Sequence, residues 1–248
     1  LESARPVDSE GKPVENPLSP PVSLREIVIA YPKLRPPVIH GLLRQGETMN
    51  VIAAPKAGKS WLADGLSLAV ASGTDWLDTF SCEPGRVLLI DGELHPETIA
   101  HRLPMVAREM GVSDACLDAI DVWPLRGTST DLLRLGAELK TLEPGRYRLI
   151  GLDAWYRFLP NGLSENLNAE VMGLYNAIDS YTARLGAAWV NIHHASKGDQ
   201  SAKGVTDVGS GAGSQSRAAD THLVLRPHEE GVPRQREENA QVVACRGC

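Results

Sequence analysis

Aromatic residues and long hydrophobic runs are scarce in this chain. Its 248 residues include only two Phe and five Tyr, so we expect a mainly aliphatic core, rich in Leu, Val, Ile and Ala. No apolar run approaches the roughly 18 residues that a membrane-spanning helix needs. The N-terminus also lacks the basic segment followed by an apolar one that marks a secretory signal. We therefore expect a cytoplasmic protein with no membrane partner.

Cysteine is scarce as well, with four residues in the chain. Cys245 and Cys248 form a Cys-x-x-Cys pair near the C-terminus. A structural zinc site would need a second pair at similar spacing, and Cys82 and Cys116 do not supply one. The pattern favours free thiols in a reducing compartment over a metal site.

The chain also lacks an excess of positive charge, since its formal net charge is −6. This balance argues against a protein whose whole surface clamps nucleic acid. It leaves room for a local basic patch or for a ring with a basic lumen. The length is sufficient for one large α/β domain with its own core.

The N-terminal part differs in composition from the rest. Residues 1–22 are polar and rich in proline, which predicts a disordered tail or linker. Residues 23–248 are expected to form the folded domain, in which the prolines between 32 and 37 exclude a long helix at its start. The chain begins without Met and ends abruptly, so we expect a piece of a longer protein.

Strands and helices alternate along the folded part. Continuous apolar runs predict buried strands at residues 49–54, 86–91, 119–123, 146–153 and 187–192, followed by late strands at 221–225 and 240–244. Apolar residues at helical spacing predict helices at residues 61–71, 96–110, 131–142 and 167–185. This alternation is typical of an α/β fold with a mostly parallel central sheet and helices on both faces.

The segment from Ala53 to Ser60 joins the first of these strands to the first helix. It matches the P-loop pattern G-x-x-x-x-G-K-[ST], except that Ala53 replaces the first glycine. Such a loop turns backbone N–H groups toward phosphate at a helix N-terminus. We expect Lys59 to reach the β- and γ-phosphates of ATP and the Ser60 hydroxyl to bind Mg²⁺. The residues expected to contact ATP are Ala54, Pro55, Lys56, Ala57, Gly58, Lys59, Ser60 and Trp61. Lys56 either adds a second cation near the phosphates or points to solvent.

Two other predicted strands end in carboxylates. The strand before Asp153 is apolar and ends in that residue, as in a Walker B motif, so Asp153 is expected to hold Mg²⁺. The second strand is followed by Asp91-Gly92-Glu93. We assign Glu93 as the general base that orients the attacking water, with Asp91 as the competing candidate.

The strand at 187–192 precedes a polar segment that begins with His193 and His194. In a parallel sheet its end faces the same crevice as the P-loop, so a histidine there can hydrogen-bond the γ-phosphate. Adjacent residues on a strand point to opposite faces, which argues against a shared metal ion. Lys197 is a contact for phosphate or nucleic acid, or a solvated loop residue. Arg217 is an arginine finger that reaches a neighbour's ATP, or a surface residue.

Together these segments resemble the RecA-like ATPases of the AAA family, and within them the RepA-type hexameric replicative helicases. The resemblance covers residues 38–225 and includes Gly41-Leu42-Leu43, the P-loop, Asp91-Gly92-Glu93, Asp153, the segment 193–198 and the run that ends at Asp220. It implies a RecA-type sheet and ATP bound between the subunits of a hexameric ring. It also implies Glu93 as catalytic glutamate, His194 or its neighbour as sensor, and Arg217 acting in trans. Ala53 departs from the family pattern, and the chain stops where the family usually continues with another strand.

Three functions fit these features. The first is an ATP-hydrolysing motor that acts on single-stranded DNA, such as a helicase in plasmid or phage replication. The second is an ATP-switched assembly or regulatory module, which the acidic net charge and the few aromatic residues favour. The third is a small-molecule kinase, because P-loops serve that chemistry too.

Overall fold

The computed structural model describes residues 20–163, 168–195, 218–227 and 240–246. It divides the chain into two compact units, Leu1–Leu34 and Arg35–Cys248. Of the tail predicted at residues 1–22, all but the last three residues lie outside the described part of the chain. The predicted boundary after residue 22 therefore stays a prediction.

The first unit contains helix α1, Leu24–Ala30, which the sequence reading did not identify. Its N-terminus is a capping box, because the Ser23 side chain accepts from the Glu26 backbone while Glu26 Oε2 accepts from Ser23 N at 2.7 Å. The Ser-x-x-Glu pattern was visible in the sequence and could have predicted this start. Every residue of α1 is exposed.

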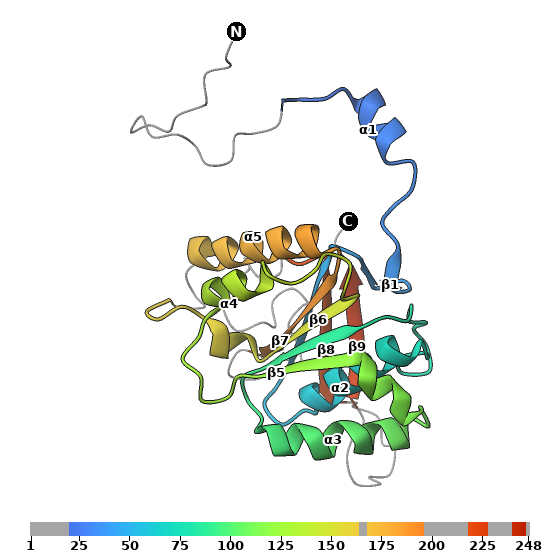
Figure 1. The fold of residues 1–248 in the computed structure, drawn as a ribbon, viewed down its shortest axis with the longest axis vertical. Helices are drawn as coiled ribbons and strands as arrows, with labels where there is room; N and C mark the ends of the chain where they lie inside the picture. The colour runs from blue at the N-terminus through green and yellow to red at the C-terminus, as the bar shows by residue number, and fades with distance from the viewer. Residues whose placement is uncertain (1–19, 164–167, 196–217, 228–239, 247–248) are drawn as a thin grey trace. The chain divides into compact units, whose positions relative to one another are not determined.

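A seven-stranded sheet in the order β5-β4-β6-β7-β3-β8-β9 forms the centre of the second unit (Figure 1). Six strands are parallel, and β9 runs antiparallel to β8 at one edge. The strands are β3 Thr48–Ala53, β4 Val87–Asp91, β5 Ile120–Pro124, β6 Leu149–Asp153, β7 Ala188–His194, β8 Thr221–Pro227 and β9 Ala240–Arg246. A small antiparallel sheet pairs β1, Pro37–Ile39, with β2, Leu43–Arg44. All seven predicted strands are present, and the predicted mostly parallel sheet is confirmed.

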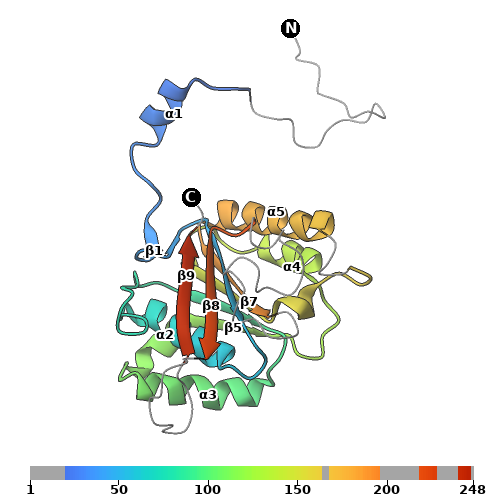
Figure 2. The ribbon, with the colours of Figure 1, turned by 180° about the vertical axis from the view of Figure 1, so that it is seen from behind.

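Helices cover both faces of this sheet, as predicted (Figures 1 and 2). One side carries α4, Leu132–Leu139, and α5, Asn168–Leu185, while the other carries α2, Lys59–Ser72, and α3, Pro96–Glu109. Two short 3₁₀ helices, η1 Asp114–Ala119 and η2 Trp155–Phe158, follow α3 and β6. None of the helices in the described ranges is long and apolar enough to span a bilayer.

The core lies in two main layers, one on each side of the sheet. One cluster joins β3 to α2, and the other joins β6 and β7 to α4 and α5. Most core residues are aliphatic, as the composition predicted. The core also contains large aromatic side chains. Four of the largest fully buried side chains are aromatic: Trp76, Trp155, Trp189 and Tyr175. The chain has few aromatic residues, but several of them lie in the core.

Cys82 and Cys116 are buried free thiols, which agrees with the reading of the cysteines as unpaired. The side chain of Cys245 and all of Cys248 lie outside the described part of the chain. The prediction that this Cys-x-x-Cys pair holds no metal therefore stays a prediction.

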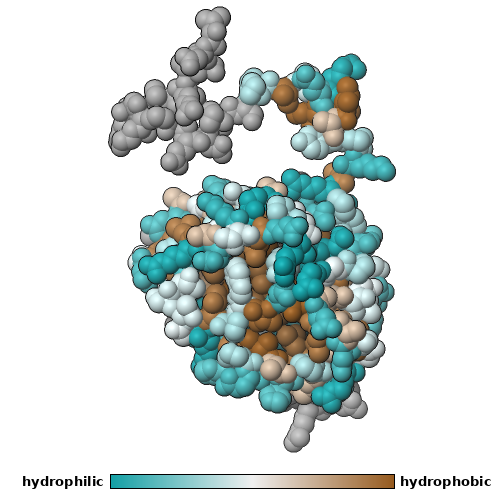
Figure 3. Space-filling model, in the orientation of Figure 1, coloured by the Kyte–Doolittle hydropathy of each residue, from teal (hydrophilic) through white to brown (hydrophobic). Residues whose placement is uncertain are grey.

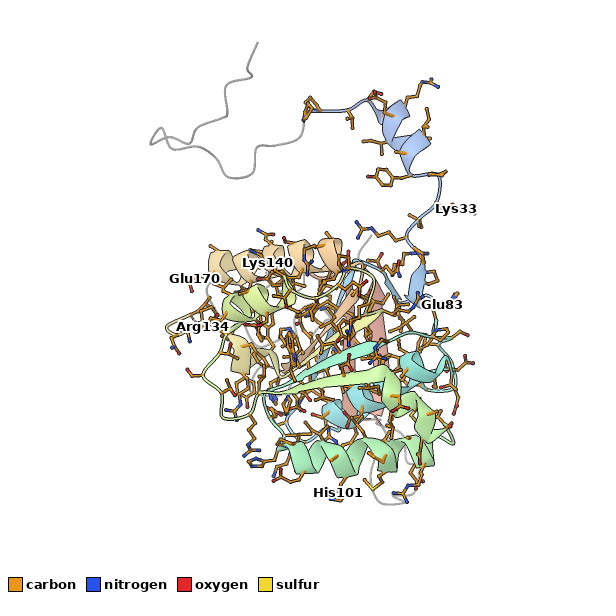
Figure 4. All side chains as sticks on the ribbon, viewed as in Figure 1. Lys33, Glu83, His101, Arg134, Lys140 and Glu170 are labelled. Atoms are coloured by element: carbon orange, nitrogen blue, oxygen red, sulfur yellow. The ribbon has the colours of Figure 1, made fainter. Side chains whose placement is uncertain are left out.

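The surface of the second unit carries both charged and hydrophobic side chains. Arg134 of α4, Lys140 at the C-cap of α4 and His101 of α3 are exposed (Figure 4). The edge strand β5 is only half-buried. On the face that β5 crosses, hydrophobic side chains gather in the middle of the surface (Figure 3). The P-loop and the acidic strand ends lie at another place, the carboxyl edge of the sheet.

Candidate active site

The parallel register brings four strand ends to one edge of the sheet. Ala53, the last residue of β3, is paired with His194 of β7. Asp91 of β4 is paired with Asp153 of β6. In open parallel sheets, ligands bind in the crevice outside the carboxyl ends of the strands. The fold therefore places the predicted P-loop, both acidic motifs and the second histidine along the same crevice.

The P-loop has a backbone that only certain residues adopt easily. Gly58 has φ of +84° and is the N-cap of α2, where no side chain caps the helix. The first amides of α2 are thus left for another acceptor, as in an anion site. Lys56 has φ of +63° and is exposed. The two alternative roles of Lys56 stay predictions.

Lys59 is buried, and its ammonium group is held by the loop itself. Its Nζ donates to the carbonyl oxygens of Ala53 at 3.2 Å and Ala54 at 3.0 Å. Burial lowers the pKa of Lys59, and the charges of Asp153 and Glu93 act in the opposite direction. The Lys59 ammonium group therefore lies close enough to Asp153 and Glu93 for their charges to affect its pKa.

The Ser60 side chain acts on the Asp153 carboxyl group and lowers its pKa. Burial outweighs this effect, and together with the charges of Asp91, Glu93 and Asp64 it raises the pKa of Asp153 to about 7. Asp153 Oδ1 is buried without a hydrogen-bond partner in the structure. A hydroxyl beside an unsatisfied carboxylate oxygen is a donor set that suits Mg²⁺.

Glu93 is fixed by contacts on its backbone and on its side chain. Its N–H donates to Asp91 Oδ1 at 2.7 Å, and its carbonyl oxygen accepts from Arg126 Nη1 at 2.5 Å. Its Oε1 accepts from the Tyr156 hydroxyl at 2.7 Å. The Asp91 carboxylate also accepts from Leu94 N at 2.7 Å. Asp91 thus closes the turn that carries Glu93, and the preference for Glu93 over Asp91 as general base stays a prediction.

The two histidines have different surroundings, as alternation along a strand predicts. His194 is half-buried, and its Nε2 lies 3.7 Å from Glu93 Oε1. His193 is fully buried beside the Tyr175 hydroxyl, 3.2 Å from its Nε2. Burial lowers the pKa of His193 to about 3, with smaller effects from His222 and His194. Within the described ranges no group of three or more His, Cys, Asp or Glu side chains could hold a metal ion.

A buried polar network behind His193 escaped the sequence reading. Tyr175 of α5 donates to Asn50 Oδ1 at 2.9 Å, and Asn191 Nδ2 donates to the same oxygen at 3.2 Å. Trp189 Nε1 donates to Asn191 Oδ1 at 2.7 Å. The network ties α5 to β3 and β7, the strands that precede the P-loop and carry the histidines. In the sequence, this network was indicated only by two asparagines, Asn50 and Asn191, that interrupt apolar strand runs.

An ion pair beside the P-loop helix also went unpredicted. Asp64 Oδ2 of α2 lies 2.6 Å from Arg102 Nε of α3, and both side chains are largely buried. Arg102 also lies over the Trp61 ring, 5.0 Å from its centroid. Burial raises the pKa of Asp64 to about 6 despite this partner. The contacts anchor α3 against the first turns of α2.

A groove of about 1020 Å³ begins at the P-loop and follows α2. Its P-loop end is lined by Ala57, Gly58 and Trp61, and its far wall by α3 and by residues around Trp76. Ligand pockets commonly have volumes of about 300–1,000 Å³. The groove is thus large enough for a nucleoside next to a phosphate site.

Lys59, Ser60, Asp153, Glu93 and His194 are therefore brought together at one edge of the sheet. Arg217 and Lys197 lie outside the described residues, so their predicted roles remain predictions. A family model described as an AAA domain matches residues 17–200, which is more than half of the chain. The match covers the P-loop and both acidic motifs. With its mostly parallel sheet and P-loop, the chain belongs to the AAA domain family of ATPases and has the α/β RecA-like P-loop fold.

Proposed function

We propose that this protein binds ATP with Mg²⁺ and hydrolyses it. The observation that carries the proposal is the burial of Lys59, the first residue of α2, with its ammonium group within reach of the charges of Asp153 and Glu93. One cation, one hydroxyl and two acids at a helix N-terminus form a set suited to phosphoryl transfer. The groove beside Gly58 and Trp61 is assigned to the nucleoside.

Ser60 and Asp153 are the residues that would hold Mg²⁺, the hydroxyl directly and the carboxylate directly or through water. When bound, the ion would neutralise charge on the phosphates. Lys59 would move from the carbonyl oxygens of Ala53 and Ala54 to the phosphate oxygens. This exchange replaces two neutral acceptors by charged ones, which strengthens the hydrogen bonds of the ammonium group.

Glu93 is assigned to orient and deprotonate the attacking water. The water oxygen bonds to the γ-phosphorus, the bond from that phosphorus to the bridging oxygen of ADP breaks, and the proton passes to the Glu93 carboxylate. His194 lies beside Glu93 and is assigned to sense the γ-phosphate. ADP and inorganic phosphate are the products.

The proposed biological role is a RecA-like motor, a RepA-type DNA helicase or another replication or recombination ATPase. Its support is the sequence resemblance, which also implies a hexameric ring and Arg217 as a residue acting in trans. Single-stranded DNA is the proposed partner. An ATP-switched regulatory module without helicase activity is the alternative.

The test measures phosphate release from ATP by the purified chain, with and without Mg²⁺ and single-stranded DNA, together with native mass. We expect Mg²⁺-dependent release and a DNA-stimulated rate from a ring. Lys140→Ala serves as a control, because that lysine lies exposed just after α4 (Figure 4). Phosphate release that is absent, or equal in wild type and Lys59→Ala, would refute ATP hydrolysis at this site. ATP binding without DNA affinity would favour the switch.

A further inference from the structure

Tyr156 contacts both of the side chains that are proposed to act on the γ-phosphate and its water. Its hydroxyl donates to Glu93 Oε1 at 2.7 Å. Its ring centroid lies 5.2 Å from that of His194. The Nε2 of His194 lies 3.7 Å from the same Glu93 oxygen. The three side chains come from three segments that are distant in sequence, so the contacts depend on the fold.

The position of Tyr156 follows from the short helix η2, which begins two residues after Asp153. The preceding residue, Trp155, is buried, with its ring 5.2 Å from Tyr175 and 5.0 Å from His193. Tyr156 is 40% exposed. Trp155 thus anchors η2 in the core, while Tyr156 reaches the crevice. Trp155 contacts His193, and Tyr156 contacts His194.

The turn that carries Glu93 packs closely on η2. Gly92 N donates to the Asp153 carbonyl oxygen at 2.6 Å. A Cβ on Gly92 would lie 3.0 Å from Phe158 Cζ and 3.1 Å from Arg157 Cβ. Such distances are tighter than most real Cβ contacts, so glycine permits the approach. The backbone of Glu93 is therefore held at a fixed distance from Tyr156.

The chemistry of the hydroxyl matches this placement. Burial and the neighbouring Glu93 raise the pKa of Tyr156, so the phenol keeps its proton and remains a donor. A neutral donor binds a carboxylate without neutralising it. Arg157 lies over the Tyr156 ring, 5.3 Å from its centroid, and adds a further contact.

We infer that Tyr156 is a positioning residue for Glu93, holding Oε1 so that Oε2 is the oxygen presented to the attacking water. The inference rests on the proposed role of Glu93 as general base. Through its contact with His194, the same ring links the position of the base to the end of β7. A freed Glu93 would sample rotamers in which Oε2 does not meet the water, and hydrolysis would slow without a change in ATP binding.

The test compares Tyr156→Phe with wild type in steady-state ATP hydrolysis. Loss of one hydrogen bond to a charged group should lower kcat about tenfold. KM for ATP should stay within about twofold, since Tyr156 makes no assigned contact with the nucleotide. Tyr147→Phe is the matched control, because its hydroxyl donates to the Asp121 carboxylate at 2.6 Å near the opposite edge of the sheet. Its kcat should equal that of wild type.

A double-mutant cycle separates positioning from general loss of structure. In the Glu93→Gln background, Tyr156→Phe should cause no further fall in the single-turnover rate. An unchanged kcat in Tyr156→Phe, an equal fall in Tyr147→Phe, or a further fall in the Glu93→Gln background would overturn this inference alone. A wild-type chain that does not hydrolyse ATP would overturn the proposed function, and this inference with it.

Discussion

The ammonium nitrogen of Lys59 donates to the carbonyl oxygen of Ala54, 3.0 Å away, from a buried position. The loop that precedes α2 thus supplies the acceptors for its own cation. Since burial lowers the pKa of Lys59, keeping the charge there costs free energy. A triphosphate would offer that charge stronger acceptors than two neutral carbonyls.

Lys59→Met tests this relationship. We expect the affinity for MgATP to fall about 100-fold, since a charge-assisted contact to phosphate is lost. The thermal midpoint without nucleotide should stay level or rise, because methionine fills the space without a desolvated charge. Isothermal titration and thermal unfolding measure the two effects. Lys140→Met is the control, and a lower thermal midpoint with unchanged affinity would mean that Lys59 has a structural role only.

Glu93→Gln should separate binding from chemistry. The amide cannot accept the proton from water, so we expect ATP binding near that of wild type and hydrolysis lowered by about 10²-fold or more. Asp91→Asn is the matched comparison, since its amide oxygen can still accept from Glu93 N and Leu94 N. Its hydrolysis should fall far less. If Asp91→Asn stopped turnover while Glu93→Gln did not, the base would be Asp91.

Ser60→Ala should change the dependence on Mg²⁺. Removal of the hydroxyl takes away one proposed ligand of the ion and the group that lowers the pKa of Asp153. We expect the Mg²⁺ concentration for half-maximal ATP hydrolysis to rise about tenfold or more, because Mg²⁺ tolerates few changes in its oxygen shell. Ser72→Ala is the control in the same helix, since that hydroxyl donates to the Leu68 carbonyl oxygen at 2.7 Å. Equal Mg²⁺ curves for wild type and Ser60→Ala would contradict the assignment.

His193 should make the folded state sensitive to acid. Its pKa is about 3 in the folded chain, against an ordinary value of 6.5. Between these values the unfolded chain binds a proton at His193 that the folded chain does not, so the contribution of His193 to stability falls as the pH drops from 6.5 toward 3. Between pH 6.5 and pH 5 this amounts to about 2 kcal/mol. The raised pKa values of Asp153 and Asp64 act in the opposite direction.

Urea unfolding across that pH range measures the effect. As the pH drops, stability should fall less, or rise more, in His193→Gln than in wild type, since the amide does not titrate. His101→Gln should follow the wild-type curve, because that residue is exposed on α3 (Figure 4). Parallel curves for wild type and His193→Gln would show that another group carries the acid sensitivity.

The fold was predictable because its signals are local. Each buried parallel strand is a continuous apolar run, as in Val87–Asp91 and Leu149–Asp153, and the helices follow the 3.6-residue pattern. The P-loop was predictable for a related reason, since Gly58, Lys59 and Ser60 are consecutive. The helix α1 was missed although its Ser23–Glu26 capping box is a local signal.

The contacts around the site were not predictable in the same way. Tyr156 meets Glu93 across 63 residues of sequence, and Arg102 meets Asp64 through the packing of α3 on α2. No single-sequence pattern specifies such pairs, because they arise from the crossing of elements whose relative position only the fold sets. The burial of the aromatic residues was not predictable either. The composition shows how many aromatic residues the chain has, but it does not show which of them lie in the core.

The most direct test is a crystal structure of the chain with Mg²⁺ and a non-hydrolysable ATP analogue. We predict the β- and γ-phosphates on the amides at the start of α2, Lys59 Nζ moved from the loop carbonyls to a phosphate oxygen, and the metal beside Ser60 and Asp153. A triphosphate bound elsewhere, with Lys59 still donating to Ala53 and Ala54, would contradict the proposed site.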